Sequence, residues 1–412
     1  MMPNELNKIS SPEFQQYLHA NESMDENKLL LAHKEVLGIP TSIMVNQIIG
    51  RRKSKIKLPT WYKTEKIIYP PTLNVEQTSS EATALFKTEI VKQILPSRNR
   101  IADLTGGFGV DSYFFSTIFQ SVHHVEINKD LLEIATHNHQ VLSATNIKHH
   151  NQSAEEFIKN LNTQLDFIYI DPSRRDINSK KIFLLADTTP NVVVLQSQFL
   201  EKADWILIKM SPLFDIQQGL AELINVEKIY VVSVANECKE LLFLLHKDFT
   251  SEPIVEAVNL TTTGEVINSF SFLLSEERET KFIQGTRSEY LYEPNASILK
   301  SGAFKLIAKR FDIQKLHVST HLYSSNKFIT DFPGRVFKIE SNFDQKMVSR
   351  LLPNGKANVL TRNYPMSAEA LKKKLKLKDG GHKFVIGFTE GSKKTVVVAS
   401  RVKQSQGQNK RS

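Results

Sequence analysis

The spacing of apolar positions along the chain changes near residue 100. Before that point apolar residues recur three and four positions apart, as in Phe14, Tyr17 and Leu18, which predicts amphipathic helices over residues 1–95. From about residue 100 to 274 the pattern becomes short apolar runs separated by helical stretches. This alternation is typical of β and α units that build a mostly parallel sheet.

Seven runs in this middle section are expected to be strands. They are residues 100–104, 121–127, 146–151, 166–170, 205–208, 228–233 and 267–274. Beyond residue 280 the elements are shorter. Helices are expected over 297–309 and 367–377, and strands over 317–321, 335–340, 358–361, 384–388 and 395–400. The fold class is therefore α/β, with a helical N-terminal region and a small α+β C-terminal region.

Composition narrows the functional classes. The chain has 412 residues, a length that favours two or three domains. Its one cysteine, Cys238, excludes a disulfide scaffold and favours a reducing cytosol. The first twenty residues lack the apolar core of an export signal, and the apolar runs are far shorter than the about 20 residues of a membrane span. We therefore expect a soluble, cytoplasmic protein with no membrane partner.

Positive charge is concentrated in the C-terminal third. Residues 281–412 hold 26 basic and 9 acidic side chains, whereas residues 1–280 hold 27 and 35. Such a block attracts polyanions, because each neutralised phosphate releases a counterion. Nucleic acid is the leading candidate partner, and Lys373 in a run of lysines is a candidate contact. The alternative is that these lysines form only the solvated face of a helix.

A glycine-rich turn follows the first predicted strand. The strand ends at Asp103, and Gly106, Gly107 and Gly109 leave room for a ligand that a Cβ would block. Glu126 ends the next predicted strand, where a carboxylate can bind both ribose hydroxyls. Two strands, two carboxylates and one glycine turn together predict a nucleoside site.

A dinucleotide-dependent dehydrogenase shares part of this pattern. Its fingerprint has a third Gly or Ala where this chain has Ser112. In addition, Asp103 would repel a pyrophosphate. S-adenosylmethionine is therefore favoured over NAD, because an aspartate can accept a hydrogen bond from its ammonium group.

A third acid, Asp171, follows the fourth predicted strand in the segment DPSRR (171–175). Open α/β sheets bind their ligands at the carboxyl ends of the strands. Methyl transfer proceeds by in-line attack, so the protein mainly has to align donor and acceptor. A carboxylate or carbonyl at Asp171-Pro172 could accept the hydrogens of an exocyclic amine, which makes Asp171 the catalytic candidate. The alternative is an aspartate that caps the next helix.

These segments resemble class I S-adenosylmethionine-dependent methyltransferases, specifically bacterial members with a C-terminal THUMP-like domain. The resemblance rests on EQTSSEATA (76–84), DLTGGFGVD (103–111), Glu126, DPSRR (171–175), KMSP (209–212), TRNYP (361–365) and DGG (379–381). It implies a Rossmann-like, seven-stranded methyltransferase core and an RNA substrate. It also implies a methyltransferase domain at 96–278, a ferredoxin-like segment at 279–325 and a THUMP-like domain at 326–405. The residue pattern adds a helical region at 1–95 and a disordered tail at 406–412.

The resemblance assigns roles to individual residues. Cofactor binding falls to Asp103, Thr105, Gly106, Gly107, Gly109, Glu126, Ser153 and Asp171. Catalysis falls to Asp171, Pro172 and Arg174, and substrate binding to Arg174, Arg175, Lys209 and Lys373. No metal is expected, because the histidine pairs at 123–124, 137–139 and 149–150 have no cysteine or carboxylate set at ligand spacing. We expect those histidines to be solvated or to lie at strand ends.

The chain departs from the family pattern at three positions. Thr105 stands where many of these enzymes have glycine, and Ser153 where an aspartate often receives the adenine amino group. Enzymes that methylate exocyclic amines usually have a second proline and an aromatic ring after Asp-Pro, whereas this chain has Ser173 and Arg174. An Arg guanidinium can stack on a base or pair with a phosphate. A base nitrogen is the expected acceptor, and the alternatives are DNA or protein as substrate, or an RNA-binding protein with a silent core.

Overall fold

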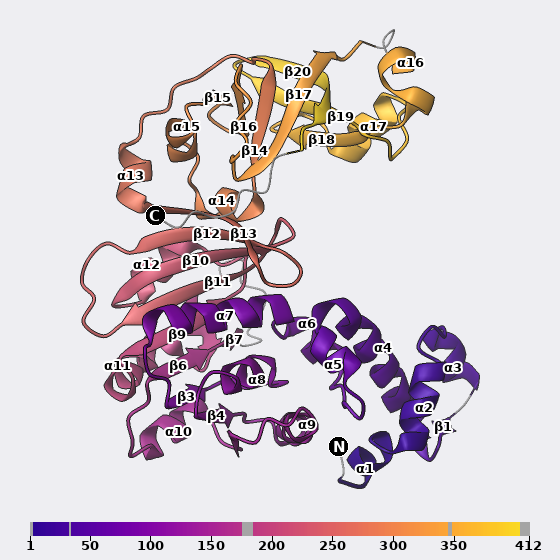
Figure 1. Ribbon diagram of the computed structural model, residues 1–412, viewed down its shortest axis with the longest axis vertical. Coiled ribbons are helices and arrows are strands. Elements are labelled where there is room, and N and C mark those ends of the chain that lie inside the picture. The colour runs from indigo at the N-terminus through magenta and orange to yellow at the C-terminus, as the bar shows by residue number, and fades with distance from the viewer. Residues whose placement is uncertain (1–2, 33, 175–183, 345–347, 404–412) are drawn as a thin grey trace. The chain divides into compact units, whose positions relative to one another are not determined.

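The computed structural model describes residues 3–32, 34–174, 184–344 and 348–403 (Figure 1). The chain divides into two compact units. The first comprises Met1–Ala235, Lys239–Glu252 and Leu260–Glu265, and the second Asn236–Cys238, Pro253–Asn259 and Val266–Ser412. Arg175, expected to contact substrate, and the tail 406–412, expected to be disordered, lie outside the described residues.

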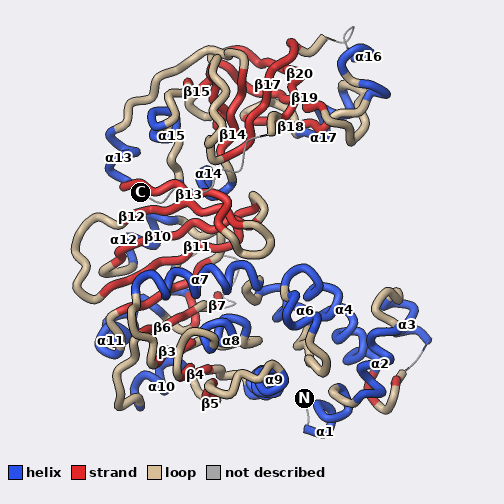
Figure 2. Tube along the Cα trace, in the orientation of Figure 1, coloured by secondary structure: helices blue, strands red, loops and turns tan. Residues whose placement is uncertain are grey.

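The N-terminal part of the first unit is mainly helical, as predicted (Figure 2). Its elements are α1 (Pro3–Ile9), α2 (Pro12–Ala20), α3 (Glu26–Ala32), β1 (Glu35–Val36), β2 (Ile39–Pro40), α4 (Thr41–Lys57), α5 (Pro59–Lys63), α6 (Thr72–Gln77) and α7 (Glu81–Ile94). Trp61 of α5 is completely buried, with ring centroids 5.0 Å from Tyr113 and 6.3 Å from Phe108. The helical region therefore packs against the segment that follows the first strand of the large sheet.

Seven strands of the large sheet lie in the first unit. They are β3 (Arg100–Asp103), β4 (Ser121–Val125), β5 (Ile147–His150), β6 (Phe167–Ile170), β9 (Trp205–Met210), β10 (Val226–Val234) and β11 (Glu237–His246). Their order is β10-β11-β9-β6-β3-β4-β5. The strands β9, β6, β3, β4 and β5 run parallel, and β11 runs antiparallel to β9. This mixed α/β sheet confirms the predicted fold class.

Helices connect the parallel strands. They are α8 (Val110–Ser116), α9 (Lys129–Val141), α10 (Ala154–Asn160), α11 (Val192–Lys202) and α12 (Ile216–Glu222). The last four begin at Asn128, Ser153, Asn191 and Asp215, each of which accepts a hydrogen bond from an amide three residues on. Between β6 and α11 lie β7 (Ser173–Arg174), η1 (Leu185–Asp187) and β8 (Thr188–Thr189). Helical returns leave the carboxyl ends of the parallel strands at one edge of the sheet.

Between residues 234 and 266 the sequence analysis missed two strands, β11 and β12 (Ile254–Leu260). In β11 the residues 240–245 are all buried, so the strand shows no alternation of apolar and polar positions. Periodicity alone cannot separate such a run from a buried helix. The last predicted strand is present as β13 (Val266–Leu273).

The second unit is an α+β structure built on a seven-stranded sheet. Its remaining strands are β14 (Tyr290–Pro294), β15 (Gln314–His317), β16 (Thr320–Ser325), β17 (Gly334–Asn342), β18 (Asn358–Arg362), β19 (Lys383–Glu390) and β20 (Lys393–Arg401). They are ordered β15-β16-β14-β17-β20-β19-β18. Its helices are α13 (Leu274–Glu279), α14 (Ala296–Ser301), α15 (Leu306–Arg310), α16 (Val348–Leu351) and α17 (Ala368–Lys374), with a short η3 at Pro353–Gly355.

Two expectations in this unit were wrong in detail. The helix predicted over 297–309 is broken into α14 and α15 by Gly302, whose φ of 84° ends α14 in the left-handed region. The strand predicted over 317–321 is interrupted by a turn at residues 318–319, which joins the end of β15 to the start of β16. None of the described helices combines the length and the apolar character that a bilayer crossing requires.

Candidate active site

Three carboxylates lie at the same edge of the large sheet. Asp103 is the last residue of β3, Asp171 follows β6, and Glu126 follows β4. The strands β6, β3 and β4 are parallel neighbours, so their carboxyl ends lie side by side. The structure therefore brings together the three acids that the sequence analysis selected.

Asp103 is almost completely buried, with 1% of its surface exposed. Its Oδ2 accepts a hydrogen bond from Ser112 Oγ at 2.6 Å, and its Oδ1 accepts one from the amide of Thr105 at 3.2 Å. Burial raises the pKa of Asp103 to about 7, and the nearby carboxylates of Asp111 and Asp171 add to this effect, although the Ser112 bond opposes it. A bound cation would stabilise the ionised form.

Two glycines of the turn are required by close packing beneath it. A Cβ on Gly106 would lie 2.2 Å from the ring of His124. Gly109 has a φ of 85°, and a Cβ there would lie 2.5 Å from His139 Nε2. Only glycine fits both places, and at Gly109 the backbone conformation adds to the restriction.

Gly107 differs from these two glycines because the space beside it is open. Its φ is 55°, and a Cβ there would meet nothing closer than the Thr105 oxygen at 3.8 Å. Its amide donates to Glu126 Oε2 at 2.9 Å, and the amide of Asn128 donates to Oε1 at 2.7 Å. These two bonds fix the Glu126 carboxylate directly beside the turn.

Ile127 is a candidate contact that the sequence analysis missed. It follows Glu126 at the sheet edge, and 70% of its surface is exposed. The carbonyl oxygens of Glu126 and Ile127 accept hydrogen bonds from Asn151 Nδ2 at 2.9 and 3.0 Å. An apolar side chain held beside a ribose-binding acid can cover one face of a base. The sequence signal was the isoleucine itself, placed two residues past the end of β4.

Ser153, which was expected to contact the adenine of the cofactor, caps the N-terminus of α10 in this fold. Its Oγ accepts a hydrogen bond from the amide of Glu156 at 3.2 Å, and Glu156 Oε2 accepts one from the Ser153 amide at 3.1 Å. This is a capping box at the start of α10. Contact with a cofactor through Ser153 stays a prediction.

Asp171 is held from two sides. Its amide donates to Thr105 Oγ1 at 2.6 Å, and its Oδ2 forms an ion pair with Lys209 of β9. Burial alone would lower the pKa of Lys209, but the carboxylates of Asp171, Glu240 and Asp111 raise it above its ordinary value. Lys209 therefore stays protonated at neutral pH and cannot serve as a base.

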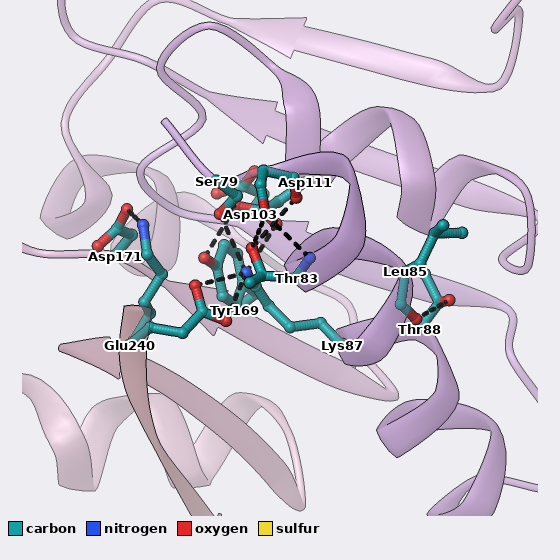
Figure 3. A network of polar contacts seen from close by, with 12 residues as sticks. Ser79, Thr83, Leu85, Lys87, Thr88, Asp103, Asp111, Tyr169, Asp171 and Glu240 are labelled. Carbon is teal, nitrogen blue, oxygen red and sulfur yellow. Dashed lines mark hydrogen bonds and ion pairs between the residues drawn. The ribbon is translucent and has the colours of Figure 1, made fainter. Parts of the chain in front are cut away.

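A buried ion network lies next to this pair (Figure 3). The completely buried Lys87 has its Nζ 3.1 Å from both Glu240 Oε1 and Asp111 Oδ1, and it donates to Ser79 Oγ at 3.0 Å. Asp111 Oδ2 in turn accepts hydrogen bonds from Ser79 Oγ at 2.7 Å and from the Tyr169 hydroxyl at 3.0 Å. The network joins α7, α8, β6 and β11.

Sequence reasoning did not select this network as part of the site. Ser79 and Asp111 lie within the segments that carry the family resemblance, but Lys87 comes one turn after the first of these segments. Glu240 lies on β11, the strand that was not predicted. Burial would raise the pKa of Asp111, yet Lys87 and Lys209 together lower it. Asp111 therefore remains charged without a ligand.

The expected substrate-binding residues are dispersed. Pro172 is buried next to Asp171, and Arg174 lies in β7, which pairs with β8. Lys209 is nine-tenths buried and is occupied by Asp171. Lys373 is exposed on α17 of the second unit.

The histidines were expected to be solvated or to lie at strand ends, which is wrong for His139 in the middle of α9, whereas His124 lies near the end of β4 but is not solvated. His124 and His139 are completely buried. His139 Nδ1 lies 2.8 Å from His149 Nε2, and His139 Nε2 lies 2.9 Å from the Gly109 oxygen. The histidine side chains fill the space under the glycine turn, which the sequence pattern did not reveal because their neighbours come from three different elements.

Comparisons with known proteins agree with this architecture. Family models match a ferredoxin-like domain over residues 290–333 and a THUMP domain-like region over residues 334–401. An uncharacterized RNA methyltransferase of Mycoplasma mobile is 28% identical over 155 residues, which are 37% of this chain and 41% of that protein. The chain thus matches less than half the length of that curated relative.

A solved structure covers nearly the whole chain. It is the crystal structure of a protein from Porphyromonas gingivalis W83 that is assigned as a methyltransferase, with 27% sequence identity and a TM-score of 0.83. The similarity covers 98% of this chain and 100% of that one. Together with the two matched domains, it identifies the chain as a protein of methyltransferase fold that carries a C-terminal THUMP-like domain, as the sequence predicts.

Proposed function

We propose that this protein transfers a methyl group from S-adenosylmethionine to RNA. The observation that carries the proposal is the meeting of Asp103, Glu126 and Asp171 at the ends of three adjacent parallel strands, around a glycine turn with open space at Gly107. The similarity to methyltransferases over the length of the chain supports the reaction class. The THUMP-like region and the RNA methyltransferase relative support RNA as the substrate class.

The site residues would bind the cofactor from its two ends. Asp103 would accept a hydrogen bond from the ammonium group of the methionine part. Glu126 would accept hydrogen bonds from the ribose hydroxyls, and Ile127 would pack against the base. Thr105, Gly106, Gly107 and Gly109 form the turn that the cofactor would cross, and Ser153 would lie near its adenine end. When bound, the cofactor supplies the sulfonium methyl group that is transferred.

Asp171 and Pro172 would position the acceptor. Because Lys209 occupies Oδ2 of Asp171 and no other residue that the structure describes bonds its Oδ1, Oδ1 could accept a hydrogen bond from an exocyclic amine. This would direct the nitrogen lone pair toward the methyl carbon, which is what in-line transfer requires. A base nitrogen is thus our proposed acceptor, and Arg174 and Arg175 would bind the surrounding nucleotide.

The second unit would hold the RNA. Lys373 is exposed near the end of α17, where three successive lysines, 372–374, form the last turn. Phosphate contacts of this kind fix the position of a nucleic acid without reading its sequence. We further propose the domain limits 1–95, 96–278, 279–325 and 326–405.

The decisive experiment measures transfer of tritiated methyl groups to separated RNA, DNA and protein fractions. Label in RNA with the wild-type protein, and its loss with Asp171→Ala, is the expected result. Label in the DNA or protein fraction instead would contradict RNA as the substrate and identify the labelled class as the substrate. If no fraction is labelled while S-adenosylmethionine and RNA both bind, the protein is an RNA-binding protein with a silent core.

A further inference from the structure

Two arginines and one glutamate form an ion cluster in the second unit. Glu293 of β14 is buried, with 3% of its surface exposed. Its Oε2 accepts a hydrogen bond from Nε of Arg335 in β17 at 2.7 Å, and its Oε1 accepts one from Nε of Arg362 in β18 at 2.7 Å. The Nη2 atoms of both arginines complete the ion pairs. One carboxylate therefore fixes two guanidinium groups, and the cluster has one net positive charge.

Close strand packing fixes the backbone around Arg335. Arg335 lies opposite Glu293 in the antiparallel pair of β14 and β17. A Cβ on the preceding residue, Gly334, would lie 2.1 Å from the Glu293 carbonyl oxygen, so only glycine permits this approach. The guanidinium carbon of Arg335 also lies 5.6 Å from the centre of the Phe337 ring. These contacts hold Arg335 in place without a ligand.

The segment TRNYP (361–365), to which the proposed reaction assigns no role, fixes the backbone around Arg362. The next residue, Asn363, has a φ of 47°, and its Nδ2 donates to Thr320 Oγ1 of β16 at 3.1 Å. Its carbonyl oxygen accepts a hydrogen bond from Thr389 Oγ1 of β19. Since β16 and β18 are far apart in the order of the strands, the sheet must curve to allow these bonds. The segment therefore serves to place Arg362.

A purely structural ion pair would not need the second arginine. One guanidinium neutralises one carboxylate, as Arg287 does for Glu390 elsewhere in this unit. A second one places two like charges next to each other, which costs free energy unless an anion lies nearby. Both side chains are also partly open to solvent, with 24% exposed at Arg335 and 36% at Arg362. An anion from solution can therefore reach them.

The two guanidinium groups keep hydrogen-bond donors for such an anion. Each has five N–H bonds, of which Glu293 engages the one on Nε and one on Nη2. Within the described residues Arg335 thus keeps three donors, and Arg362 keeps two after its Nη1 donates to the Thr361 oxygen at 2.7 Å. Forked N–H donors of this kind match the oxygens of a phosphate group. Because both side chains are already held in place, little conformational entropy is lost on binding.

We propose that Arg335 and Arg362 bind the phosphate backbone of the RNA substrate, with Glu293 as the residue that positions both. This inference rests on the proposed function, because it assigns the RNA contact of the second unit to two particular side chains. Residues 281–412 hold 26 basic and 9 acidic side chains, which attracts a polyanion to this unit. Contacts to phosphates fix the position of a nucleic acid and do not depend on its sequence.

Fluorescence anisotropy with the full chain and a fluorescein-labelled RNA hairpin of arbitrary sequence tests the arginine pair. Arg335→Gln and Arg362→Gln should each weaken binding about fivefold at about 0.1 M salt. Each should also lower the slope of log affinity against log salt concentration by about 0.7–0.9, because one phosphate contact is lost. Arg287→Gln is the matched control, since it removes one charge from an ion-paired arginine of the same unit that is 25% exposed. It should change neither the affinity nor the slope.

A measurement on the wild-type protein covers the case in which a glutamine variant does not fold. Phenylglyoxal modifies accessible arginines, and mass spectrometry follows the rate at each residue. A saturating amount of the RNA hairpin should slow the modification of Arg335 and Arg362 at least about threefold, because bound phosphate excludes the reagent, and should leave Arg287 unprotected. Polyglutamate at the same charge concentration should protect neither arginine of the pair.

The outcomes are separable. Equal losses in Arg287→Gln and in the two test variants would reduce the effect to net charge and overturn the pair as a site. Unchanged affinity and slope, or no protection by RNA, would also overturn it, whereas methyl transfer to RNA by the same protein would keep the proposed function. Equal protection by polyglutamate would assign the pair to an acidic protein partner instead. If the wild-type protein binds no RNA at all, the RNA substrate and the arginine pair fail together.

Discussion

Thr105 Oγ1 accepts a hydrogen bond of 2.6 Å from the amide of Asp171. The bond ties the cofactor turn after β3 to the proposed catalytic segment after β6. A glycine at position 105, common in related enzymes, could not make it. The departure from the family pattern is therefore a structural link between the proposed donor site and the proposed acceptor site.

Thr105→Val tests this link, because valine keeps the shape of threonine and removes the acceptor. The buried Asp171 amide loses its partner, which costs about 1–3 kcal/mol locally. We expect the rate of methyl transfer at saturating cofactor to fall about tenfold, with the cofactor dissociation constant changed less than threefold. A Thr105→Ser variant, which keeps the hydroxyl, should retain the rate. An equal loss in both variants would contradict the role of the bond.

The two glycines of the turn that have positive φ, Gly107 and Gly109, should respond differently to the same change. Gly109→Ala places a Cβ 2.5 Å from His139 Nε2, so we expect a loss of folding stability of more than about 2 kcal/mol in urea unfolding. Gly107→Ala meets open space and should cost only about 1 kcal/mol of backbone strain. If the open space holds the cofactor, Gly107→Ala should still weaken S-adenosylhomocysteine binding at least tenfold. Wild-type affinity in Gly107→Ala would place the cofactor elsewhere.

Lys87→Met should destabilise the first unit strongly. The change leaves Asp111 and Glu240 buried without their shared cation, a situation that typically costs 3–5 kcal/mol. Urea unfolding measures the loss. Lys92→Met is the control, since Lys92 lies on the same helix in an exposed pair with Glu89 and should change stability by less than about 0.5 kcal/mol. Similar losses in the two variants would refute the role of the network.

The buried histidines predict a loss of stability in mild acid. Burial lowers the pKa of His139 to about 4, although its bond to the Gly109 oxygen acts in the other direction. The unfolded chain takes up a proton near pH 6.5 that the folded chain refuses until about pH 4, so this contribution is complete above pH 6.5 and is lost as the pH falls toward 4. For His139 alone it amounts to about 3 kcal/mol.

Thermal unfolding at pH 7 and pH 5 measures this effect. His139→Gln keeps an N–H for the Gly109 oxygen but cannot be protonated, so its melting temperature should fall less between the two pH values than that of the wild type. An equally steep fall in the variant would assign the acid sensitivity to other groups.

The carboxylates at the strand ends could be predicted from the sequence, whereas the buried residues that pack beneath them could not. Asp103, Glu126 and Asp171 are readable because each follows an apolar run, and parallel strands bring such positions to one edge. Lys87 and Glu240 are 153 residues apart, and their pairing depends on the position of β11, which a continuous apolar run does not reveal. The burial of His124 was missed for a related reason, because it depends on Gly106 and on α9 rather than on its own neighbours in the chain.

The position of Lys87 bears on where the catalytic part of this protein begins. A fragment started at residue 96 would contain the seven strands β3–β6 and β9–β11 and every proposed cofactor contact. It would nevertheless leave Asp111 and Glu240 without the ammonium group that α7 places between them. The shortest active fragment must therefore begin before Ser79. That starting point lies inside residues 1–95, which the sequence pattern predicts as a separate helical region. Helix α7 and the proposed cofactor site after β3 therefore belong to one folding unit.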